Sequence, residues 1–300
     1  MSNINSPFLM YSHHHFQTND RVYFVMPFMK GGDLYEYLRK KSLSLEQIKY
    51  IAAQVAVGLN SLHESGIIYR DLRPENVLLE ESGYIRLADF GISKYINISE
   101  HTMTFCGASE YLSPEIILGK GYDKKHDWWA MGVFLFELVY GFPPFFDEST
   151  ERLYDLICHT EIEFPNKEQK TFLLSDIKDL ISQLLHKDPN RRLGAKEGLA
   201  EIKSHPFMKN IDFEYLTGKR INTGLCPCDG SANNFKLNES EVLVKKNNPC
   251  NEVSEKELEE LTINFSEEFT NGDLNMSFIG EKGKELIHSS ESLFATFHSK

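Results

Sequence analysis

Cysteine is scarce in this sequence, and its few copies are scattered. The 300 residues include five cysteines, an odd number, and only Cys226 and Cys228 lie close together. A single intervening residue is the wrong gap for a zinc knuckle, and widely spaced thiols do not form a recognisable disulfide framework. We therefore expect reduced cysteines.

Long apolar runs and excess positive charge are also missing. No run approaches the roughly 20 residues that cross a membrane, and the N-terminus lacks the basic and apolar regions of a signal peptide. The sequence therefore predicts no membrane span and a location in the cytosol or nucleus. The net charge of -12 argues against a nucleic-acid surface or an anionic membrane as a partner, and it favours basic peptides.

The composition is that of an ordinary soluble chain, with 41% apolar and 25% charged residues. Its length suffices for one large domain or two small ones. A helix is predicted from Ser44, which can form a capping box with Gln47, to a stop at Gly66. Apolar residues at helical spacing predict further helices over 127–139 and 176–186. The helix over 127–139 is apolar on nearly every face, so it should be buried all round.

Short β-type segments surround these helices. Alternation over 22–26 predicts a half-buried or fully buried strand that ends in a hinge at 30–33. The runs 77–79 and 85–87 predict a strand, a tight turn and a second strand. From about Met208, Asn, Ser, Lys and Glu dominate, which predicts a tail or a wrapping segment without a core of its own.

Two short motifs carry the chemistry. Residues 69–76 read YRDLRPEN, and Asp89-Phe90-Gly91 follows thirteen residues after Asn76. Asp71 can accept the proton of an attacking hydroxyl, while Asn76 and Asp89 offer the hard oxygen ligands that Mg²⁺ prefers. The strand pair over 77–79 and 85–87 should present both ligands side by side. This order of acidic and amide groups is typical of phosphoryl transfer from a magnesium nucleotide.

The chain from about Pro7 onward resembles a serine/threonine protein kinase of the AGC family. The motifs that carry the resemblance are YFVM at 23–26 through GGDL at 31–34, YRDLRPEN at 69–76, ADFG at 88–91, TFCG at 104–107, EYLSPE at 110–115, DWWAMG at 127–132, DPNRRLG at 188–194 and HPF at 205–207. The resemblance implies an α+β protein-kinase-like fold. It divides into a remnant of the N-terminal lobe (1–28), the helical C-terminal lobe (29–207) and an AGC-type C-terminal tail (208–300), expected to be partly disordered.

The resemblance also implies that ATP and Mg²⁺ are cofactors. It makes Met26 the gatekeeper, places the backbone of Pro27 and Met29 against the adenine, and adds Asp33 and Leu78 to the nucleotide site. Proline lacks an N–H, but its position needs only a carbonyl acceptor. The implied catalytic residues are Asp71, Arg73 and Asn76, and the implied metal ligands are Asn76 and Asp89.

The expected partners are protein substrates with basic residues upstream of the acceptor, and an upstream activating kinase. Glu75 and Glu137 match positions that bind substrate arginines in basophilic members, where carboxylate and guanidinium pair bidentately. Thr104 matches the activation-loop phosphorylation site, with Arg70 and Lys94 placed to receive its phosphate, although it can also be an ordinary loop threonine. The remaining implied pair is structural and buried, Glu115 with Arg192.

The sequence departs from the family pattern in several places. We find no glycine-rich loop, no strand lysine and no partner glutamate for it, so most of the N-terminal lobe is expected to be missing and apolar strand residues such as Phe24 to lose their cover. Arg73 replaces the usual lysine on the transferring phosphate, and Ala108 replaces a threonine whose hydroxyl bridges that lysine and the catalytic aspartate. Ser109 replaces the proline after it.

Two readings of function remain open. The first is an AGC-type kinase that transfers the γ-phosphoryl group of ATP to Ser or Thr of proteins. The second is a catalytically weak or inactive, pseudokinase-like interaction module. For the chain as given, we expect weak or no binding of Mg-ATP. A longer coding sequence that holds the missing parts would restore the first reading.

In the tail, FSEEF at 265–269 resembles the segment across the nucleotide cleft, and FATF at 294–297 resembles a hydrophobic motif followed by His298.

Overall fold

The computed structural model describes residues 4–17, 21–96, 101–165, 172–225 and 227. The described residues fall into two compact units, which we treat separately. The larger unit holds residues 4–10 and the described residues from Met29 onward, and the smaller unit holds the described residues between Tyr11 and Phe28. None of the helices within these described ranges combines the length and the apolar character needed to cross a membrane.

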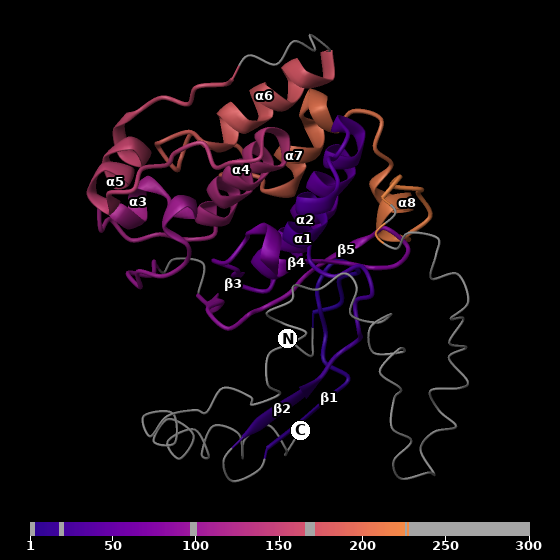
Figure 1. The fold of residues 1–300 in the computed structure, drawn as a ribbon. Coiled ribbons are helices and arrows are strands. Elements are labelled where there is room, and N and C mark those ends of the chain that lie inside the picture. Colours follow the sequence, from indigo (N-terminus) through magenta and orange to yellow (C-terminus); the bar gives the residue numbers. More distant parts are fainter. Residues whose placement is uncertain (1–3, 18–20, 97–100, 166–171, 226, 228–300) are drawn as a thin grey trace, which may run out of the picture. The chain divides into compact units, whose positions relative to one another are not determined.

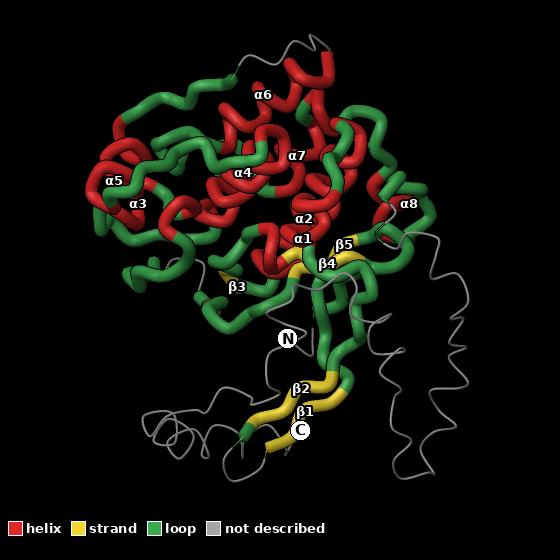
Figure 2. Tube along the Cα trace, viewed as in Figure 1, coloured by secondary structure: helices red, strands yellow, loops and turns green. Residues whose placement is uncertain are grey.

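The smaller unit is a two-stranded antiparallel ribbon, drawn in yellow in Figure 2. Strand β1 (His14–Gln17) pairs with β2 (Val22–Val25), and Phe16 stacks on Tyr23 with ring centroids 4.8 Å apart. The predicted strand is confirmed, but its predicted burial is wrong, since Phe24 is 63% exposed. Among the described residues of this unit, no second layer covers the two strands, which agrees with the expected loss of cover at Phe24.

The larger unit is mainly helical (Figures 1 and 2). Its helices are α1 (Leu34–Lys40), α2 (Leu45–Glu64), α3 (Pro114–Ile117), α4 (Lys125–Tyr140), α5 (Thr150–His159), α6 (Phe172–Leu184), α7 (Leu199–Ser204) and α8 (Phe213–Thr217). Its short strands are β3 (Ile67–Ile68), β4 (Val77–Leu79), β5 (Ile85–Leu87) and β6 (Lys94–Tyr95), and its 3₁₀ turns are η1 (Pro74–Asn76), η2 (Ser109–Tyr111) and η3 (Pro206–Met208). Together with the short strands, these helices form the α+β kinase-like fold that the resemblance implied.

Helix α2 forms where its sequence signals predict. Ser44 accepts a hydrogen bond from the backbone N–H of Gln47, whose side chain in turn accepts from the backbone N–H of Ser44, so the capping box is confirmed. The chain leaves the helix at Gly66, whose φ of +72° is a conformation that glycine adopts without strain. One face of α2 packs against α4 and another against β5, so the helix is buried over most of its length.

Helix α4 is the central element of the core. It contacts α2 and α6 (Figure 1), and its side chains are buried from His126 to Val139 except Glu137. The approach to α6 is close at Gly132, where an added Cβ would lie 2.8 Å from the Leu185 side chain. The predicted burial on all faces is confirmed. The helix is slightly longer than the predicted 127–139, and α6 begins and ends earlier than the predicted 176–186.

The hairpin of β4 and β5 has the predicted strands, paired antiparallel with Val77 opposite Leu87 and Leu79 opposite Ile85. The described part of the predicted tail packs back against this hairpin. The Tyr84 hydroxyl donates to the carbonyl of Ile221 at 2.6 Å, and Leu216 in α8 is fully buried. Residues 209–225 therefore wrap around the larger unit. The tail motifs at 265–269 and 294–297, with His298, lie outside the described residues.

A buried carboxylate joins α4 to the loop after β3. Asp127 accepts hydrogen bonds from the backbone N–H groups of Tyr69 and Arg70, both at 2.9 Å, and lies 2.7 Å from Nε2 of His63. Burial raises the pKa of Asp127, but the hydrogen bond and charge of His63 outweigh it and keep that pKa below its ordinary value. The ionised carboxylate therefore fixes the backbone of residues 69 and 70 to the core.

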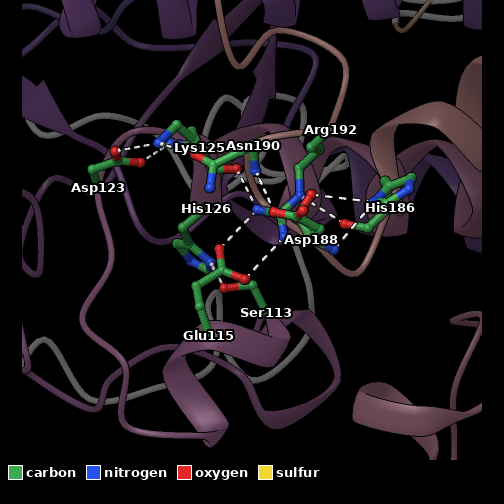
Figure 3. A network of polar contacts seen from close by, with 9 residues as sticks. All are labelled: Ser113, Glu115, Asp123, Lys125, His126, His186, Asp188, Asn190 and Arg192. Atoms are coloured by element: carbon green, nitrogen blue, oxygen red, sulfur yellow. Dashed lines mark hydrogen bonds and ion pairs between the residues drawn. The ribbon is translucent and has the colours of Figure 1, made fainter.

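A second buried carboxylate belongs to an ion pair (Figure 3). Both guanidinium NH groups of Arg192 donate to Glu115, at 2.7 and 2.9 Å, and Arg192 also donates to the backbone carbonyls of Lys125 and His186. The two side chains are 0% and 6% exposed. Burial raises the pKa of Glu115. The hydrogen bonds and charge of Arg192 lower that pKa and outweigh burial, so the net shift is downward. The pair connects α3, the start of α4 and the loop after α6.

The first prediction concerns this ion pair. We expect Glu115→Gln to lower the free energy of unfolding by about 3–5 kcal/mol, because it strands the buried Arg192 charge. The matched change Glu81→Gln, in a pair whose carboxylate is 61% exposed, should cost less than about 1 kcal/mol. Urea unfolding at pH 7 measures both. Equal costs for the two variants would contradict a structural role of the Glu115 pair.

The same pair predicts a pH dependence. The folded-state pKa of Glu115 lies below the ordinary 4.5. The contribution of the ionised carboxylate to the free energy of unfolding is therefore fully present above the unfolded-state pKa, and it is lost as the pH falls through the folded-state pKa. The difference in unfolding free energy between wild type and Glu115→Gln should therefore shrink below a pH of about 4.5. A constant difference down to pH 3 would show that the ion pair is not its source.

A further prediction concerns Asp127. In Asp127→Asn the amide NH₂ must face one of the two backbone N–H groups, so we expect a loss of about 3 kcal/mol or more from an unsatisfied buried donor. Asp123→Asn, four residues away and 23% exposed, is the matched control and should lose about 1 kcal/mol. Urea unfolding again measures the difference. A small cost at Asp127 would mean that the loop is held by other contacts.

Candidate functional site

The loop from Tyr69 to Asn76 lies between β3 and β4, and it brings the predicted polar residues to one end of the β4–β5 hairpin. Asn76 sits at the end of η1, where its Nδ2 donates to the backbone carbonyl of Asp71 at 2.9 Å. Its own carbonyl accepts from the backbone N–H of Ala88, at 2.9 Å. Asp89 is the next residue, so Asp71, Asn76 and Asp89 are neighbours in space.

Asp89 stands on an unusual backbone. Its φ is +46°, a left-handed conformation that aspartate adopts more readily than most residues. Its Oδ1 accepts from the backbone N–H of Gly91 at 3.0 Å, an Asx-type turn that holds the side chain. The residue is exposed, so its carboxylate faces solvent beside the loop of Asp71.

The carboxylate of Asp71 is electrostatically perturbed. Burial raises its pKa, the hydrogen bond from Asn76 and the charge of Arg73 lower it, and the charges of Asp89 and Glu75 raise it again, with a net upward shift. Two carboxylates that repel each other beside an amide oxygen form a hard-oxygen donor set. The described residues contain no cluster of three or more His, Cys, Asp or Glu side chains able to hold a metal ion, so the oxygens of Asp71, Asn76 and Asp89 match magnesium in ligand type alone.

The predicted nucleotide residues divide between the two units. In the larger unit, Asp33 forms an isolated antiparallel bridge with Leu78, and Met29 is buried nearby in sequence. Asp33 also caps α1 by accepting from the backbone N–H of Glu36 at 2.8 Å. Met26, which is 52% exposed, and Pro27 belong to the smaller unit.

Arg73 and Glu75 lie against each other, although the resemblance implies separate roles for them. Nε of Arg73 donates to Oε2 of Glu75 at 2.9 Å, and an NH group donates to Oε1 at 2.6 Å. Burial raises the pKa of Glu75, but Arg73 lowers it by a larger amount in total. Glu137 accepts instead from the hydroxyl of Tyr111, and burial raises the pKa of Glu137.

The predicted phosphorylation segment has a network of its own. Lys94 donates to the hydroxyl of Thr102 at 3.0 Å, and that hydroxyl donates to the hydroxyl of Thr104 at 3.3 Å. Arg70 donates to the Tyr122 hydroxyl at 3.1 Å, which in turn donates to the Thr104 carbonyl at 2.7 Å. Thr104 itself is exposed. Each of the two predicted cations therefore reaches Thr104 through one intermediate side chain.

Sequence reasoning missed some residues that position the site. Asp127 and His63 hold the backbone of the loop, and Tyr122 connects Arg70 to the Thr104 segment. Asp127 had a usable signal, since a carboxylate in a helix apolar on nearly every face must be buried and partnered. His63 and Tyr122 had none, because the contact of His63 with Asp127 and that of Tyr122 with Arg70 join residues 50 or more positions apart in the sequence.

Known proteins are similar to this chain over most of its length. The family profile described as "Protein kinase domain" matches residues 1–208. The RAC family serine/threonine-protein kinase homolog of Dictyostelium discoideum is 39% identical over 241 residues, which are 79% of this chain and 52% of that protein. Human serine/threonine-protein kinase Sgk1 is 39% identical over 238 residues, 79% of this chain and 54% of that protein.

Another relative extends the comparison to fungi. Serine/threonine-protein kinase gad8 of Schizosaccharomyces pombe is 41% identical over 236 residues, 77% of this chain and 40% of that protein. The chain thus spans about half, or less, of the length of the curated relatives it matches. Since the profile covers more than half of the chain and the relatives agree with it, the chain belongs to the protein kinase family, among the AGC serine/threonine kinases.

Proposed function

We propose that the chain is the catalytic part of an ATP-dependent kinase that transfers the γ-phosphoryl group to Ser or Thr of proteins. The observation that carries this proposal is the grouping of Asp71, Asn76 and Asp89 at one end of the β4–β5 hairpin. The loop that carries Asp71 is fixed to the core by Asp127. A rigid loop supports catalysis by positioning, which supplies much of the rate in phosphoryl transfer.

The chain's own residues have distinct tasks in this proposal. Asp71 accepts or orients the proton of the acceptor hydroxyl. The hydrogen bond from Asn76 to the backbone carbonyl of Asp71 fixes the position of Asp71 in the loop. Asn76 and Asp89 would hold Mg²⁺, which would supply charge neutralisation at the nucleotide phosphates. Within the larger unit, Met29, Asp33 and Leu78 would contact the nucleotide. Arg73, which pairs with Glu75 while its charge also acts on Asp71, would offer part of that charge to the phosphate.

A basic protein substrate follows from the charge near the site. Asp33, Glu75 and Glu137 are close enough that the charge of Glu75 raises the pKa of the other two, after burial as the main cause for each. Such a group attracts guanidinium or ammonium side chains. The net charge of -12 adds long-range attraction for a basic peptide.

Scattered, reduced cysteines support a location in the cytosol or nucleus.

A specific observation favours a second candidate, a non-catalytic interaction module. Arg73 is engaged with Glu75, and Ala108 has no hydroxyl to bridge the cation and Asp71. A scaffold, however, has no use for the grouped oxygens of Asp71, Asn76 and Asp89. We therefore place the kinase first, and the experiment below separates the two candidates.

The fourth prediction tests the reaction itself. With labelled ATP, Mg²⁺ and a basic serine peptide, we expect Asp71→Asn to lower the transfer rate by roughly 10²–10⁴-fold, because it removes the group that accepts the proton. Asp89→Asn should abolish any rise in the thermal unfolding midpoint that Mg-ATP produces, because it removes a metal ligand. Transfer is read from the labelled peptide, and binding from the unfolding midpoint.

Asp155→Asn is the matched control, since that carboxylate is 73% exposed and pairs only with His159 among the described residues. It should change neither readout. Transfer by Asp71→Asn at the wild-type rate would refute the proposed base. No transfer by the wild type, with unchanged folding, would refute the kinase and favour the interaction module.

The fifth prediction concerns Thr104, which we propose is phosphorylated by an upstream kinase. Phosphothreonine installed at position 104 should raise the unfolding midpoint by roughly 2–6 °C at low salt, because its dianion can pair with Lys94 and Arg70. In 0.5 M NaCl the rise should shrink. Lys94→Met should lose most of it, whereas Lys124→Met, at an exposed position, should not. A rise that is insensitive to salt and to Lys94 would contradict this arrangement.

A further inference from the structure

In the ion pair between Arg73 and Glu75, Arg73 occupies the carboxylate of Glu75, which a basic substrate would otherwise bind. Two parallel N–H donors of the guanidinium meet the two carboxylate oxygens at 2.9 and 2.6 Å. This fork-to-fork arrangement uses both oxygens of Glu75 at once. A substrate arginine could bind Glu75 in the same way only after Arg73 had left.

The two neighbouring carboxylates are in a different state. Glu137 accepts one neutral hydrogen bond, from the Tyr111 hydroxyl, and Asp33 caps α1. Within the described part of the chain, neither carboxylate is in an ion pair. Burial raises the pKa of both, and the charge of Arg73 offsets part of that rise at Glu137, whereas at Glu75 the hydrogen-bonded Arg73 contributes to a net lowering. A substrate cation would therefore be the first hydrogen-bonded counter-ion for Asp33 and Glu137, but the second for Glu75.

We propose that Arg73 is a specificity-determining residue that fills the Glu75 subsite from within, so that a basic substrate is selected through Asp33 and Glu137 without a contribution from Glu75. This inference rests on the proposed function, because it assumes a peptide that binds beside Asp71. It goes beyond that function by assigning Arg73 a role in recognition. One guanidinium in the chain takes the place of one guanidinium in the substrate.

The balance of free energies supports this role. Arg73 and Glu75 are two residues apart, so their pairing is intramolecular and does not depend on the substrate concentration. A substrate arginine that displaced Arg73 would form hydrogen bonds equivalent to those it broke, and it would gain nothing from the exchange. The side chains are 37% and 38% exposed, so the pair is screened by water, but the competing pair would be screened equally.

The test is peptide binding, read by fluorescence anisotropy at low salt without nucleotide. The probe is a labelled serine peptide with several upstream arginines, together with versions in which each arginine is replaced by alanine. For the wild-type chain we expect Glu75→Gln to change the affinity less than about 2-fold. For Arg73→Ala we expect an affinity about 10-fold higher, which corresponds to about 1.4 kcal/mol.

Two comparisons make the result specific. The gain in Arg73→Ala should vanish in Arg73→Ala/Glu75→Gln, and it should vanish with the peptide that lacks one particular arginine. Arg152→Ala is the matched control, because it removes the same charge from an exposed arginine on α5, away from Asp33, Glu75 and Glu137. It should change the affinity for all peptides less than about 2-fold, since screening limits the effect of a distant surface charge.

Three outcomes would overturn the inference. They are the absence of a gain in Arg73→Ala, a gain that persists without Glu75, and a loss of 10-fold or more on Glu75→Gln in the wild type. The last would mean that Glu75 binds the substrate while Arg73 is present. Phosphoryl transfer is measured separately, so the proposed reaction and this selectivity can each fail alone.

Discussion

The buried carboxylate of Asp127 is the contact on which the site depends. It is inaccessible to solvent, and its charge is balanced by two backbone N–H groups and by His63. Moving residues 69 and 70 would leave an anion unpaired in the core, at a cost of several kcal/mol. The loop that carries Asp71 is therefore fixed to α4, a helix that is buried over most of its length.

Arg70 transmits this constraint to the segment around Thr104. Its backbone N–H is bound to Asp127, and its φ of +70° directs the chain so that the guanidinium reaches the carbonyl of Ile92 and the hydroxyl of Tyr122. Burial raises the pKa of Tyr122 to about 12, so its hydroxyl stays protonated and donates to the Thr104 carbonyl. One buried carboxylate thus organises both the loop of Asp71 and the segment that would be phosphorylated.

Local sequence signals predicted the elements, and long-range contacts escaped them. The capping box of Ser44 and the strands of the β4–β5 hairpin depend on residues close in sequence, which is why they could be predicted. The burial of β2 could not, because alternation does not reveal whether a second layer is present. Helix α8 was not predicted because its 5 residues are too few for a periodic pattern, although Asp212 caps its N-terminus and Leu216 packs in the core.

The pairing of Arg73 with Glu75 shows how two departures from the family pattern act together. A cation in a half-buried position needs acceptors, and Ala108 cannot supply the hydroxyl that the resemblance places there. Glu75 supplies two oxygens, and only the planar fork of arginine can use both at once. A lysine at 73 would satisfy a single oxygen and leave the other for a substrate. The exchange of lysine for arginine therefore bears on which peptide binds as well as on the charge beside Asp71.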